Sequence, residues 1–129
     1  MITVALGELK DIIDGLSEIA ETKLPVKTAY WVNKISRVVV KEFGTFEDQR
    51  IKLINRYAKK DEKGRPLIEN DNFVLADAEG FNKDFSELAS MEIDLHVNPF
   101  SIDQFGDIEI SPLSLAKLGR LLADDPVNI

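Results

Sequence analysis

The feature that most constrains this chain is a segment from Pro25 to about Lys60 in which a helical pattern continues without a clear stop. Proline is tolerated in the first turn of a helix because its missing N–H would have no partner there. Residues recur at intervals of seven: Val32, Val39, Phe46 and Leu53 form one row, and Ser36, Phe43, Arg50 and Tyr57 form its companion. The polar members of the companion row favour a packed helix over a strict coiled coil. A helix over residues 25–60 would be roughly 50 Å long, so it needs a partner helix from this chain or another.

Glycines mark the middle and the end of this helix. Gly44 costs about 1 kcal/mol relative to alanine in a helix interior, so it is expected to mark a bend or a break into two helices. Gly64 can adopt the left-handed conformation that ends helices, and Pro66 prevents the helix from resuming. The basic residues Lys59, Lys60 and Lys63 suit the negative pole of a helix in its last turn. A phosphate-binding loop would need its glycines before a helix, so this segment is predicted to be a helix stop.

Three shorter helices are predicted from apolar residues spaced three and four apart. The first covers residues 6–20, the second covers residues 79–91 after a candidate N-cap at Asp77, and the third covers residues 112–122 after a candidate N-cap at Ser111. Their apolar faces consist of Leu9, Ile12, Ile13, Leu16 and Ile19, of Phe81, Phe85, Leu88 and Met91, and of Leu115, Leu118, Leu121 and Leu122. Gly15 weakens the first pattern slightly.

Short strands are predicted between these helices. Ile93, Leu95 and Val97 alternate with Glu92, Asp94 and His96, which is typical of a half-buried strand. Shorter candidates lie at residues 2–4, 73–76 and 108–110. The 129 residues predict a single domain, 1–129, of the α+β class and predominantly helical. In this fold the long helix packs antiparallel on the shorter helix 79–91, beside a small β-sheet of short strands. The tail, residues 123–129, is expected to be frayed and flexible.

The net charge of −7 is unevenly distributed along the chain. Residues 1–64 hold 12 Lys and Arg against 10 Asp and Glu, whereas residues 65–129 hold 4 against 13. The acidic half would repel phosphates, so direct binding of nucleic acid is not expected there. In the long helix, aromatic residues alternate with basic ones, which suits either a nucleic-acid stacking surface or, more simply, an amphipathic helix with a basic solvent face.

Five residues are candidates for contact with a partner protein. The apolar faces of helix 79–91 and of the following strand turn Asp84, Glu87, Glu92 and Asp94 outward, so these carboxylates could share one surface. That surface is either a solvated acidic face or a contact site for a basic partner. Trp31 lies beside the predicted seam of the long helix, and partial exposure there would suit a protein interface.

The side chains of this sequence predict no catalytic, cofactor-binding or metal site. There is no cysteine, and His96 is the only histidine. Glu92, Asp94 and His96 along one strand would span about 14 Å, too far for one ion. The serines lack a neighbouring histidine and the glycines of a nucleophile elbow, so the chain is not expected to be an enzyme. No apolar run approaches the roughly 20 residues of a transmembrane helix, so no membrane association is expected.

The chain resembles small tailed-phage and prophage proteins of unknown function. The resemblance rests on "LPVKTAYWVNKI", "EFGTFEDQRIKLINRYAKKDEKGRP", "FNKDFSELASMEIDL" and "IEISPLSLAKL", and it covers most of residues 6–122. The family pattern has a glutamate three residues before an arginine, which Glu47 and Arg50 match. Ser114 stands where an acid is often found in the last motif. The resemblance implies a phage-encoded, non-enzymatic protein and carries no catalytic residues.

The expected function is therefore protein–protein contact, in virion assembly or in modulation of a host factor. The alternative is an acidic decoy that mimics DNA and occupies a host nucleic-acid-binding or defence protein. The partner would be a phage structural protein or a host protein, in the cytoplasm of the host bacterium or with the virion. Self-association is expected to be weak or to depend on a partner.

Overall fold

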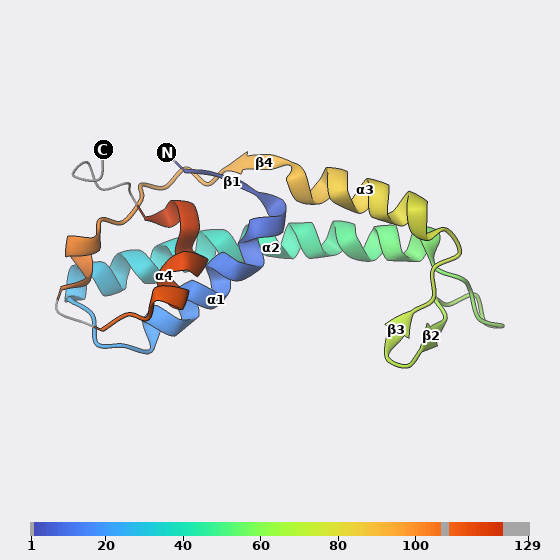
Figure 1. Ribbon diagram of the computed structural model, residues 1–129, viewed down its shortest axis with the longest axis horizontal. Coiled ribbons are helices and arrows are strands. Elements are labelled where there is room, and N and C mark those ends of the chain that lie inside the picture. The colour runs from blue at the N-terminus through green and yellow to red at the C-terminus, as the bar shows by residue number, and fades with distance from the viewer. Residues whose placement is uncertain (1, 107–108, 123–129) are drawn as a thin grey trace.

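A computed structural model describes residues 2–106 and 109–122 of the protein. Its spine is α2 (Val26–Tyr57), an uninterrupted helix of 32 residues, which is about 48 Å long (Figure 1). The other helices, α1 (Leu9–Ala20), α3 (Ala78–Ser90) and α4 (Pro112–Leu118), are shorter. Two antiparallel strand pairs complete the fold, β1 (Thr3–Ala5) with β4 (Glu92–Asp94) and β2 (Ile68–Glu69) with β3 (Asn72–Phe73). The predicted class, α+β and predominantly helical with a long helix packed on shorter ones, is confirmed.

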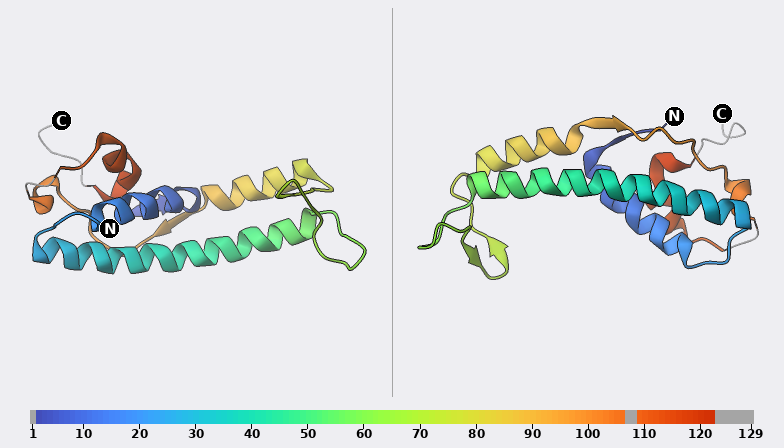
Figure 2. Two further views of the ribbon diagram at one scale, coloured as in Figure 1. Left: turned by 90° about the horizontal axis from the view of Figure 1, so that it is seen from below. Right: turned by 180° about the vertical axis from the view of Figure 1, so that it is seen from behind.

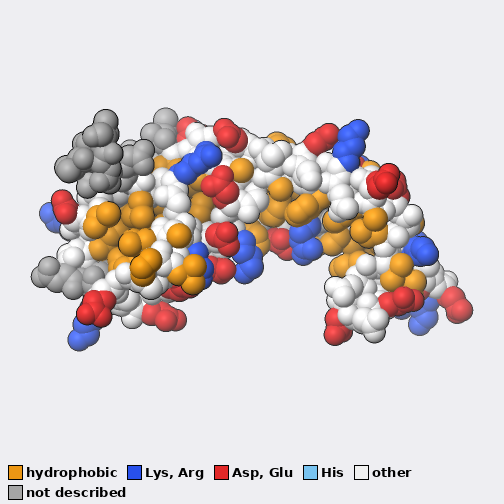
Figure 3. Space-filling view, viewed as in Figure 1, with side chains coloured by type: hydrophobic (Ala, Val, Ile, Leu, Met, Phe, Trp, Pro, Cys, Tyr) orange, Lys and Arg blue, Asp and Glu red, His pale blue; other side chains and the backbone are white. Residues whose placement is uncertain are grey.

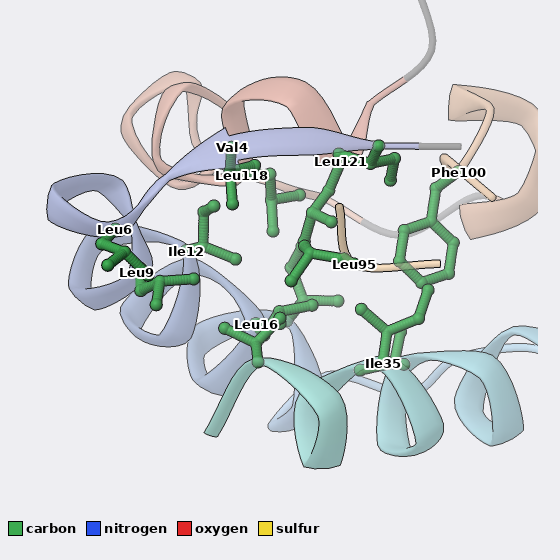
Figure 4. Close-up of a cluster of buried hydrophobic side chains, with 14 of the residues drawn as sticks. Val4, Leu6, Leu9, Ile12, Leu16, Ile35, Leu95, Phe100, Leu118 and Leu121 are labelled. Atoms are coloured by element: carbon green, nitrogen blue, oxygen red, sulfur yellow. The ribbon is translucent and has the colours of Figure 1, made fainter. Parts of the chain in front are cut away.

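The main core lies around the N-terminal half of α2, where α1 and α4 pack (Figure 4). The predicted faces of α1 and of the last helix supply six of its buried residues, and the segment around β1 adds Ile2, Val4 and Leu6. Leu95, Phe100 and Phe105, which follow β4 in the chain, close it from the other side. From α2 it receives Val32, Ile35, Val39 and Phe46, three of which belong to the predicted seam. Burial of side chains of this size contributes roughly 1.5–3 kcal/mol each.

The second half of α2 packs against α3 through aromatic side chains. Hydrophobic side chains are visible along the boundary between the two helices (Figure 3). The ring of Phe46 lies 6.0 Å from that of Phe85, and the ring of Tyr57 lies 6.3 Å from that of Phe81. No residue of α3 is fully buried, because α3 has α2 on one side only. Met91, predicted to complete this apolar face, follows the helix and is 55% exposed, so that prediction was wrong.

Gly15 and Gly44 play different structural roles. Gly44 neither bends nor breaks α2, which continues through it, so that expectation was wrong. A Cβ atom built on Gly44 would meet nothing within 4 Å. Gly15 is buried between α1 and α4, and a Cβ atom there would lie 3.0 Å from the Cβ of Lys117. Gly15 therefore permits a close helix–helix approach that the sequence pattern did not reveal.

The strands differ in length and position from the predicted ones. β1 and β4 pair in the register Val4 with Ile93, but β4 ends at Asp94 instead of continuing to Val97. His96 has a φ of 56°, a turn conformation, so it does not lie in a strand as predicted. Of the predicted strand 73–76, Phe73 lies in β3 and Leu75 forms an isolated bridge with Ala58, while Val74 and Ala76 are not in a strand. Of the predicted strand 108–110, residue 108 lies outside the described residues and the other two are not in a strand.

The boundaries of the helices move by a few residues. α2 ends at Tyr57, because Ala58 and Lys60 form antiparallel bridges with Leu75 and Pro66. Lys60 therefore lies beyond the last turn of the helix, and Gly64, with a φ of 79°, lies in a turn in which its amide donates to the Asp61 carbonyl at 3.0 Å. The last helix, predicted to reach Leu122, becomes a 3-10 turn over Gly119–Leu121. The tail 123–129 lies outside the described residues.

An ion pair joins α1 to α4. Lys117 Nζ lies 2.6 Å from Glu18 Oε1, and the Ser114 hydroxyl donates to Glu18 Oε2 at 2.5 Å. These two hydrogen bonds, that from Lys117 above all, hold the pKa of the Glu18 carboxyl below its ordinary value of 4.5. A carboxyl with a lowered pKa in the folded state stabilises the fold fully above its unfolded pKa, and this contribution is lost as the pH falls through the folded pKa.

We expect Glu18→Gln to reduce the acid dependence of unfolding. Between about pH 5 and pH 3 the wild-type protein should lose more of its free energy of unfolding than the variant, because only the wild type has this carboxyl to protonate. Urea unfolding followed by circular dichroism at several pH values measures the slope. Glu21→Gln is the control, since Glu21 is exposed and makes no described ion pair. Parallel pH curves for wild type and Glu18→Gln would contradict the prediction.

Candidate partner-binding surface

The outer face of α2, opposite the core, carries a row of uncovered apolar residues. Every other helix lies on one side of α2 in the left-hand view of Figure 2. On the opposite side, steps of three and four residues connect positions 26, 30, 33, 37, 40, 44, 48 and 51, which a helix of about 3.6 residues per turn places on one face. We call Val26, Tyr30, Val40, Gly44 and Ile51 the outer stripe. Its four large side chains are 87%, 60%, 52% and 49% exposed, in that order.

Basic side chains accompany the outer stripe. Five exposed cations of α2 lie on it or along one flank: Lys27, Lys34, Arg37, Lys41 and Lys52. Within the described residues, none of the five lies within 4.0 Å of a carboxylate oxygen. The exposed acid on this face is Asp48, since Glu47 is paired with Arg50 at 2.8 Å. Positive side chains therefore outnumber negative ones beside the outer stripe.

Trp31 is exposed, in agreement with the expectation for an interface residue. It is 44% exposed, its ring lies 5.4 Å from that of Tyr30, and Lys34 Nζ lies 5.1 Å from its centroid. It lines a groove of about 520 Å³, together with His96 and Pro99 among others. Trp31 therefore adds aromatic surface beside the outer stripe at the N-terminal half of α2.

Asp84 is held by the end of α2 and does not point freely into solvent. Its Oδ2 accepts a hydrogen bond of 2.5 Å from the Tyr57 hydroxyl and lies 3.8 Å from Arg56 Nη1. The hydrogen bond to Asp84 raises the pKa of Tyr57. Asp84 thus fastens α3 to α2. Along α2, Trp31 and Tyr57 are separated by roughly 39 Å, so Trp31 and Asp84 cannot belong to one small site.

The other three carboxylates have different surroundings. Glu87 is exposed on α3. Glu92 and Asp94 lie on the same side of β4, opposite Ala5 and Thr3 of β1. Asp94 Oδ1 accepts a hydrogen bond from the His96 amide at 2.8 Å, which fixes the turn after the strand.

A cation from the end of the chain reaches these strands. Arg120 donates from Nη1 to the Thr3 carbonyl at 2.8 Å, and the same atom lies 3.9 Å from Glu92 Oε1. Its Nη2 lies 3.7 Å from Glu8 Oε1. Sequence spacing gave no signal for this arrangement, because Arg120 is distant from Glu92 along the chain. The four carboxylates are therefore interrupted by basic groups and do not form one uniform acidic face.

Comparisons with known proteins give no relative for this chain: no protein-family model matches it, and no curated protein or solved structure matches it significantly. Among residues 2–106 and 109–122 no three His, Asp or Glu side chains converge as metal ligands would. In the same part of the chain, no helix combines the length and the apolar character needed to cross a membrane. The outer stripe is the surface with the most distinctive chemistry. Its spacing was present in the sequence, but the interleaved polar residues made it look like an ordinary solvent face.

Proposed function

We propose that this chain is a phage-encoded, non-enzymatic protein that acts through protein–protein contacts, in virion assembly or in modulation of a host factor. The observation that carries the contact function is the outer stripe, with four large apolar side chains about half or more exposed on one helix face. Single exposed apolar residues are ordinary, whereas aligned ones with a polar rim are typical of interaction surfaces. The phage origin is supported by the sequence resemblance alone, and it places the protein in the host cytoplasm or with the virion.

The shape of the molecule supports a contact role. α2 extends well beyond the core formed with α1 and α4, and only α3 accompanies it to the base of the β2–β3 hairpin (Figure 1). A helix of this length presents a straight surface that a partner can follow over many turns. Burial of apolar surface at about 25 cal/mol per Å² would then stabilise the complex.

We expect the double variant Val40→Glu/Ile51→Glu to lose its partner while keeping its fold. Both side chains are about half exposed, so charges there cost little stability but would be buried unpaired in a complex. The measurement is recovery of partners by the tagged chain from bacteria that support the phage, with circular dichroism as the fold check. Ile102→Glu/Leu113→Glu is the matched control, since these residues are 58% and 66% exposed and lie outside the outer stripe. Equal recovery of the same partners by both double variants would refute the contact role of the outer stripe.

The acidic decoy stays the second proposal, favoured by the charge of residues 65–129 and opposed by the basic groups beside Asp84 and Glu92. We expect Asp84→Asn/Glu87→Gln/Glu92→Gln/Asp94→Asn to stay folded with a lower melting temperature, because the Asp84 and Asp94 carboxylates accept hydrogen bonds from Tyr57 and from the His96 amide. A decoy would lose binding to its basic partner and the steep salt dependence of that binding. Unchanged binding by the folded variant would remove the decoy proposal.

A further inference from the structure

We infer that the outer stripe of α2 binds an acidic amphipathic helix of another protein, which lies along α2 and approaches it most closely at Gly44. This inference rests on the proposed contact function and specifies the chemistry of the partner. Three features of α2 carry it: the open space at Gly44, the spacing of the stripe, and the sign of the charges beside it.

Within the described chain, neither the backbone conformation nor a close contact requires a glycine at position 44. Its φ is not positive, it lies within the regular helix, and a Cβ atom there would meet nothing within 4 Å. Glycine costs about 1 kcal/mol relative to alanine at such a position. Gly15 and Gly7, in contrast, each face a neighbour within 3.2 Å of a built Cβ. By analogy with those positions, Gly44 would allow a second backbone to approach α2 from outside.

The spacing of the stripe suits a helix as the partner. Val40 and Gly44 are four residues apart, on successive turns of one face, and Ile51 follows on the same face two turns after Gly44. From Val26 to Ile51 the stripe is about 38 Å long. A side chain of the partner can enter the gap at Gly44, between Val40 and Ile51. An extended strand would require unpaired backbone groups on this surface, and α2 has none to offer.

The charges decide between the possible occupants. Five exposed cations and one exposed acid, Asp48, line this face, so a partner with glutamates or aspartates beside its apolar row would complement it. A second copy would place the lysines of one α2 against those of the other, which is unfavourable. Nucleic acid would match the cations but would leave the aliphatic side chains of Val40 and Ile51 against a charged phosphate backbone. The protein helix satisfies both the apolar and the basic part of the surface.

The test uses the full chain and a fluorescent helical peptide of about five turns, with Leu at steps of three and four and Glu at the flanking positions. A second peptide carries Lys in place of Glu, and a short DNA duplex is the third probe. Binding is measured by anisotropy at two salt concentrations, with each peptide at a concentration at which it is monomeric alone. We expect the Glu peptide to bind at least ten-fold more tightly than the Lys peptide, with an affinity that falls as salt rises.

Variants locate the site. Gly44→Leu should weaken binding of the Glu peptide at least ten-fold. Gly44→Ala should weaken binding several-fold and at the same time raise the melting temperature of the chain. A purely structural role of Gly44 would not produce weaker binding together with higher stability. Ile102→Glu/Leu113→Glu should bind like the wild type. Equal binding of the two peptides, unchanged binding by Gly44→Leu, tighter binding of the duplex, or a stripe-dependent dimer in light scattering would each overturn the inference. If Val40→Glu/Ile51→Glu still loses partners from cells in that case, the contact function stands and only the partner's chemistry is wrong.

Discussion

Replacement of Phe100 by alanine is expected to lower the free energy of unfolding by about 3–5 kcal/mol. The side chain is 2% exposed and its ring lies 5.4 Å from that of Phe105. Its backbone amide donates to the Leu121 carbonyl at 2.6 Å, so Phe100 also joins the loop after β4 to the end of the chain. Removing the ring would leave a cavity in the core. The surrounding elements, α1, α2 and α4, cannot all move to fill it.

Equilibrium urea unfolding, followed by far-UV circular dichroism, measures this effect. Ile102→Ala is the matched control, because Ile102 lies two residues further along and is 58% exposed. Its expected cost is within about 0.5 kcal/mol, as for an ordinary surface substitution. If both variants unfolded at the same urea concentration, the assignment of Phe100 to the core would be wrong.

Gly15→Val is expected to destabilise the fold by about 3 kcal/mol through overpacking between α1 and α4. Even the first added carbon would lie 3.0 Å from the Cβ of Lys117 and 3.2 Å from the backbone nitrogen of Leu118. The backbone of α4 cannot yield without moving Leu118, which is fully buried. Separation of α1 from α4 would also pull Glu18 away from Lys117.

Gly44→Val makes the same chemical change where a built Cβ meets nothing within 4 Å. Valine is a slightly better helix former than glycine, so this variant should be as stable as the wild type or more stable. Thermal unfolding of the two variants side by side separates steric conflict from helix propensity. A similar melting temperature for both would show that Gly15 is not the site of a tight helix contact.

Features that depend on nearest neighbours along the chain could be predicted from the sequence. Asp77 accepts a hydrogen bond from the Gly80 amide at 3.0 Å, and Ser111 accepts one from the Ser114 amide at 3.1 Å, so both predicted N-caps are confirmed. α2 begins directly after Pro25, as predicted. Caps and apolar spacing act over three or four residues, and a single sequence contains all of that information.

Features that depend on distant segments were decided by the tertiary structure. β4 ends early because the chain turns at His96 toward Phe100, and the acidic residue Glu92 acquires Arg120 as a neighbour from the other end of the chain. Gly15 and Gly44 look alike in the sequence, each an interruption in a helical pattern. They differ because α4 packs closely against Gly15, whereas no element of the described chain packs against Gly44.

The same distinction applies to the candidate site. By itself the sequence determined that α2 is a long amphipathic helix with apolar residues on more than one face and with an excess of cations. The tertiary structure decided which face is covered, because α1 and α3 both pack on the side of Val32, Val39 and Phe46, while α4 packs on α1. Burial is a property of the assembled elements, since it depends on which surfaces meet and not on the residues alone. The outer stripe remains exposed for that reason.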